Sequence, residues 1–142
     1  MLFLSNILGY VREEGVKGRF IWPMFWALVV VFAISIMVMF AQFMPMRFNA
    51  FIAWPILFVL GVILLVLTIR TQMEGKLKRF LLITGASPIG FVVFVFLHNI
   101  ISGLFNTEEA IFFTLATMVC PVGFLVGAIG SIVLNAKRIK AN

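Results

Sequence analysis

Acidic residues are scarce in this chain: its 142 residues include five glutamates and no aspartate. None of these glutamates falls inside the four long apolar segments of the sequence. A proton antiporter driven by a membrane-embedded carboxylate needs such a residue, so its absence argues against that class. The chain also lacks a phosphate-binding loop, a nucleotide fingerprint, a histidine pair for haem or zinc, and a Ser/His/Asp set.

Cysteine and histidine each occur once, as Cys120 and His98. A single cysteine cannot form an intrachain disulfide, so the redox compartment cannot be inferred. Met37 and Met39 offer soft thioether ligands of the kind that suit Cu(I), but their helical spacing turns them about 200° apart. We therefore expect no metal site, and the sequence implies no particular cofactor.

Polar surface is also in short supply. Hydrophobic residues make up 63% of the chain, charged residues 11%, and the mean hydropathy is +1.19. A soluble domain has about a quarter of its residues charged, so lipid must surround most of this chain. The net charge of +6 does not indicate nucleic-acid binding, because the cations cluster at the ends of apolar segments.

Four apolar segments are long enough to cross a bilayer, which takes about 20 residues. The sequence therefore predicts a single-domain, all-α integral membrane protein in which four transmembrane helices form an up-down bundle. A cleavable signal peptide is excluded because the first apolar segment continues well past a normal signal core. The predicted domain covers residues 1–142, with spans at 22–44, 50–69, 80–105 and 110–134.

The segments outside the spans give further predictions. Residues 2–14 have the apolar spacing of a short amphipathic helix in the membrane interface, which Gly15 and Gly18 should end. Residues 43–49 should form a tight turn, and Asn106 or Thr107 should cap the fourth helix. The two acids that follow, Glu108 and Glu109, suit the positive N-terminal end of that helix. Ten of the eleven Lys and Arg residues would lie on one side, which predicts a multi-pass membrane protein with both termini cytoplasmic.

The third span carries a line of polar side chains on one helix face. Thr84, Ser87, His98 and Ser102 share this face, and Asn99 lies about a quarter-turn away. These five residues are the candidate ligand- or solute-binding positions, since polar groups should avoid lipid. Alternatively, the hydroxyls bond to their own helix backbone, and His98 makes an interhelical hydrogen bond to Gln42, to Asn99 or to a carbonyl.

The third and fourth spans share the pattern T-x-x-[S/C]-P-[I/V]-G-F, in residues 84–91 and 117–124. The two spans run in opposite directions, so the pattern is consistent with a small inverted repeat or with chance. Pro88 and Pro121 within it should kink their helices. A stripe of small residues on the fourth span predicts close packing, either between copies or against the third span: Ala116, Cys120, Gly123 and Gly127.

Three functions fit this sequence. The first is a small non-enzymatic membrane protein that acts through helix–helix contacts, as a homo-oligomer or as a subunit of a membrane complex. The second is an oligomeric transporter or channel with a polar path along the third helix. The third is an intramembrane redox or lipid-modifying enzyme, or a quinone- or ligand-binding protein, that uses His98. The expected partners are membrane lipids and other membrane-embedded chains, not nucleic acid.

Overall fold

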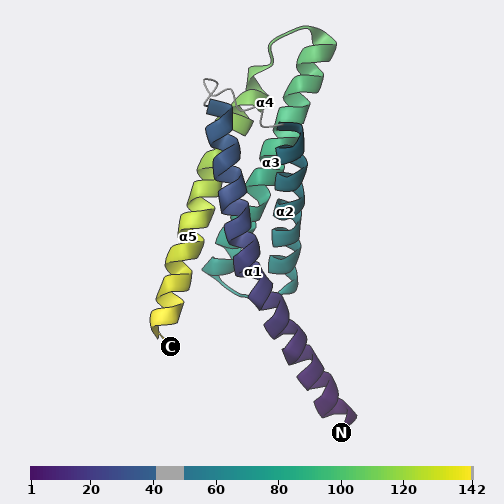
Figure 1. The fold of residues 1–142 in the computed structure, drawn as a ribbon, viewed down its shortest axis with the longest axis vertical. Helices are drawn as coiled ribbons and strands as arrows, with labels where there is room; N and C mark the ends of the chain where they lie inside the picture. The colour runs from purple at the N-terminus through teal and green to yellow at the C-terminus, as the bar shows by residue number, and fades with distance from the viewer. Residues whose placement is uncertain (41–49, 142) are drawn as a thin grey trace.

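The computed structural model describes residues 1–40 and 50–141. All regular secondary structure in these two ranges is helical (Figure 1). The predicted end of the first span at residue 44 and the turn at 43–49 lie outside the described residues. The elements, in order, are α1 (Leu2–Phe40), α2 (Ala50–Arg70), α3 (Lys76–Phe105), α4 (Ala110–Thr114), the π-helical turn η1 (Leu115–Val119) and α5 (Cys120–Ala141).

The first helix is longer than predicted. The chain is helical without interruption from Leu2 to Phe40, so the prediction of a separate interfacial helix at 2–14 is wrong. Gly15 and Gly18 do not end it, because a glycine inside a helix costs only about 1 kcal/mol. The helix-favouring Glu, Lys and Arg residues around the two glycines offset that cost. The N-terminal part of α1 consequently extends away from the other helices (Figure 1).

The third helix begins one turn earlier than predicted, at Lys76. Gly75 precedes it with φ of 82°, a conformation that glycine adopts without steric cost. At the other end, Asn106 ends α3 in the left-handed conformation, with φ of 49°. Pro88 lies inside this helix, which remains continuous on both sides of the proline.

The fourth predicted span is divided by the π-helical turn η1. Pro121 has no N–H, and its ring would collide with the carbonyl of Thr117 in a regular helix. The chain widens just before the proline, and the Cys120 N–H donates to the carbonyl of Leu115, five residues earlier. Beyond Pro121 the helix continues to Ala141, past the predicted end at residue 134.

Helix α3 packs against both α2 and α5, and α1 packs against α2. Both termini lie toward the same end of the molecule, and the connection between α3 and α4 lies at the opposite end (Figure 1). Four described stretches are long and apolar enough to span a membrane: Arg19–Met37, Ile52–Arg70, Lys76–Phe105 and Ala110–Ala141. The prediction of an all-helical chain with four spanning-length apolar helices is confirmed.

Candidate functional site

The predicted polar residues of α3 form two groups with different surroundings. Thr84 and Ser87 are buried, and each hydroxyl donates to the carbonyl four residues earlier, that of Phe80 at 2.8 Å and that of Ile83 at 2.8 Å. This is how hydroxyls satisfy themselves inside a helix without a partner from another element. Neither hydroxyl hydrogen is therefore left to bind a ligand.

Glycines of α5 cover these two hydroxyls. A Cβ added to Gly127 would lie 2.6 Å from Thr84 Oγ1 and 2.8 Å from the Thr84 backbone nitrogen. A Cβ added to Gly123 would lie 3.1 Å from Ser87 Oγ. The stripe of small residues on α5 therefore packs against α3 of the same chain, and at this level no space for a solute remains between the two helices.

The two copies of the shared sequence pattern pack against each other. Ser87 of the first copy faces Gly123 of the second, and Cys120, the counterpart of Ser87, faces Gly90, the counterpart of Gly123. A Cβ added to Gly90 would lie 3.3 Å from Cys120 Sγ. The two contacts are thus equivalent under exchange of the copies, as in a local antiparallel pair with approximate two-fold symmetry.

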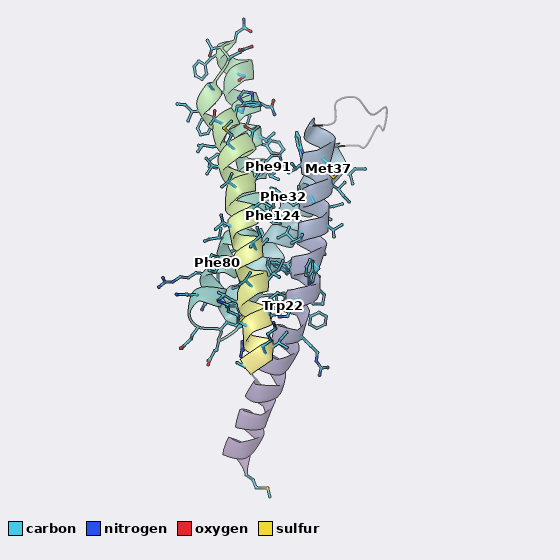
Figure 2. The ribbon with its side chains drawn as sticks, turned by 90° about the vertical axis from the view of Figure 1, so that its left-hand side faces the viewer. Trp22, Phe32, Met37, Phe80, Phe91 and Phe124 are labelled. Atoms are coloured by element: carbon cyan, nitrogen blue, oxygen red, sulfur yellow. The ribbon has the colours of Figure 1, made fainter. Side chains whose placement is uncertain are left out.

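The phenylalanines that end the two patterns share one partner. Phe91 and Phe124 both contact Phe32 of α1, with ring centroids 5.9 Å and 4.2 Å away. All three rings are buried and lie near the middle of the helices (Figure 2). Ala116 and Cys120 are also buried, so the predicted packing residues belong to the interior of one chain.

His98 lies farther along α3, where it connects that helix to α4. Its Nδ1 lies 2.9 Å from the backbone carbonyl of Glu109, and its ring centroid lies 5.4 Å from that of Phe113. A carbonyl only accepts, so Nδ1 carries the hydrogen and donates it. His98 therefore holds the end of α3 to the start of α4. Among the described residues, no group of three His, Cys, Asp or Glu side chains is placed to hold a metal ion.

Asn99 directly follows His98 and Ser102 lies about one helical turn beyond it, but their environments differ. Asn99 is exposed and donates to the carbonyl of Val95 at 2.9 Å. Ser102 Oγ is the one buried side-chain oxygen or nitrogen in the described residues that has no hydrogen-bond partner. Seven serine and threonine hydroxyls with described side chains bond to the carbonyl four residues earlier in their helix: Ser35, Thr68, Thr84, Ser87, Thr114, Thr117 and Ser131.

Glu109, one of the two acids expected to suit the N-terminal end of the fourth helix, has a more specific role than predicted. Its carboxylate oxygens accept from the backbone N–H groups of Ile111 at 3.1 Å and Phe112 at 3.0 Å. Glu109 therefore caps α4, and the prediction that Asn106 or Thr107 would do so is wrong. The acid directly before the apolar stretch caps the helix because its carboxylate satisfies the free N–H groups of the first helical turn.

The structure thus brings Thr84 and Ser87 against α5 and His98 beside the start of α4, as two separate groups. No family model, no curated protein and no solved structure matches this chain.

Proposed function

We propose that this protein is a multi-pass integral membrane protein that acts through contacts of its outward-facing helix surfaces, either with a second copy or with another membrane protein. The proposal rests on the packing between α3 and α5, which leaves no space for a solute between them at the level of Thr84 and Ser87. Thr84 and Ser87 of α3 and Gly123 and Gly127 of α5 pack the two helices together. The outward surface is the part of the molecule that remains available for other molecules.

That outward surface is large and apolar. Only 22–33% of each spanning stretch is buried within the chain. A water-soluble protein would not leave so much apolar surface open, whereas in a bilayer it can contact lipid or a neighbouring helix. We propose that the helices form an up-down bundle in the membrane. Both termini lie on the cytoplasmic side, because the cations gather at the end where α2 and α5 finish and α3 begins.

The transporter and enzyme hypotheses receive less support from the geometry. A path along α3 would have to pass Thr84 and Ser87, which the glycines of α5 cover. A reaction at His98 would need a second catalytic group, but the ring is held by a backbone carbonyl and packs near Phe113.

Purification tests this proposal directly. We would extract the tagged protein from its own membranes in mild detergent and measure the mass of the particle by native mass spectrometry. The expected result is a second copy or a stoichiometric partner, retained equally by wild type and by His98→Ala. A monomeric particle that passes solutes in liposomes, with flux abolished by His98→Ala, would contradict the proposal and favour transport.

A further inference from the structure

One end of the molecule carries a concentrated set of cations that the helix packing brings together. We call these seven residues the basic collar: Arg70, Lys76, Lys78, Arg79, Lys137, Arg138 and Lys140. Arg70 ends α2 and Lys76 begins α3, with only residues 71–75 between them. Gly130 of α5 faces the ring of Phe80, with a Cβ position 2.5 Å from it, so the last turns of α5 lie beside the first turns of α3.

The depth of these cations follows from where the apolar stretches end. Arg70 is the last residue of one spanning stretch, and Lys76 is the first residue of the next. If the helices cross a bilayer, the collar lies in the layer of lipid headgroups at one face. Long Lys and Arg side chains at this depth keep their charged ends among the headgroups while their stems cover apolar surface.

Little negative charge lies near the collar to neutralise it. Glu74 is the one glutamate with a described side chain at this end, whereas Glu108 and Glu109 lie at the opposite end of α3. Six of the seven cations are exposed and Lys78 is half-buried. Among the described side chains at this end, the seven cations of the collar stand against one glutamate, so the collar presents a net positive charge to the headgroup layer.

We propose that the basic collar binds the phosphate groups of anionic phospholipids in the leaflet that surrounds this end. This inference rests on the proposed membrane placement. The cations come from the ends of three helices that lie at the same end of the bundle, an arrangement that suits headgroups around it. Each Lys or Arg near an anionic membrane surface contributes about 1 kcal/mol, which corresponds to roughly a fivefold change in affinity.

Native mass spectrometry of the full-length protein in detergent provides the test. The protein is titrated in parallel with phosphatidylglycerol and with phosphatidylcholine. We expect about a tenfold or greater preference for phosphatidylglycerol, which falls as salt is raised. The variant Lys76→Gln/Lys78→Gln/Arg79→Gln should lose most of this preference. The matched control Lys76→Arg/Lys78→Arg keeps the charge and should retain it.

Equal binding of the two lipids, or a preference that survives neutralisation, would overturn the proposal. Displacement of the lipid by equimolar glycerol phosphate would also overturn it, since the collar would then take free phosphate and not a lipid surface. Alkaline extraction of membranes separates the two proposals. A protein that stays in the membrane pellet but shows no lipid preference refutes only the lipid proposal, whereas a protein released by alkali refutes the membrane placement itself.

Discussion

At the scale of single residues, glycines determine how closely two of the helices pack. Gly123 and Gly127 let α5 approach α3 so closely that the hydroxyls of Thr84 and Ser87 fit beneath it. The sequence singled out these four positions, but periodicity alone could not distinguish a solute path from a packed seam. The difference depends on which element lies opposite, and that is a property of the fold.

Replacing Gly127 by alanine should destabilise the protein. The new methyl group would lie within 2.9 Å of two backbone atoms, the Thr84 nitrogen and the Phe80 oxygen, which cannot move aside alone. Overpacking of this kind costs about 1–3 kcal/mol. Gly103→Ala is the matched control, because nothing lies within 4 Å of its Cβ position. That change should be neutral or stabilise by up to about 1 kcal/mol.

Thermal unfolding in detergent, followed by circular dichroism, compares these two alanine variants. A Gly127→Ala protein as stable as Gly103→Ala would show that α3 and α5 do not pack as closely as described.

Replacing Glu109 by alanine should loosen the start of α4. The variant loses the two hydrogen bonds to the N–H groups of Ile111 and Phe112, a loss that costs about 1 kcal/mol for a helix cap. Hydrogen–deuterium exchange should speed up at those two amides. Glu108→Ala removes the same charge from an exposed neighbouring position and should leave both amides protected. Equal exchange in the two variants would contradict the capping role of Glu109.

At the scale of helices, the sequence predicts the number of apolar helices well because spanning length and hydropathy are local properties. The predicted 50–69 span and α2 differ by a single residue. The predicted helix boundaries are wrong where a single helix-breaking residue and its neighbours favour different structures. Gly15 and Gly18 are weak helix breakers that the neighbouring residues override. The wider turn before Pro121 is not repeated before Pro88, so neither hydropathy nor the shared pattern could predict it.

The contact between α2 and α3 depends on glycine as well. A Cβ on Gly61 would lie 2.9 Å from the backbone oxygen of Gly85 and 2.9 Å from Ile89 Cγ1. A Cβ on Gly85 would meet mainly the side chain of Leu65, at 3.1 Å, which can shift. We therefore expect Gly61→Ala to destabilise the fold by about 1–3 kcal/mol and Gly85→Ala by less.

Unfolding of these two variants by denaturant, under matched detergent conditions, measures the difference. A larger loss for Gly85→Ala would mean that the two helices approach each other differently.

At the scale of the whole molecule, α3 holds the structure together. It contacts α2 along one side and α5 along another. Phe91 and Phe124, which end the two copies of the shared pattern, both contact Phe32 of α1. Trp22 and Phe80 lie toward the end from which α1 extends, and Met37 lies toward the other end (Figure 2). The cations gather at the first of these ends. This separation of charge along the helices is the basis for the proposed membrane orientation.

Site-directed labelling of single cysteines measures that orientation most directly. In a Cys120→Ala background, Glu108→Cys and Lys140→Cys place one thiol at each end of the molecule. We predict that a membrane-impermeant maleimide labels position 108 in intact cells and labels position 140 only after permeabilisation. Labelling of both positions from the same side would contradict the membrane crossing by the last helical stretch, Ala110–Ala141, and with it the proposed up-down bundle.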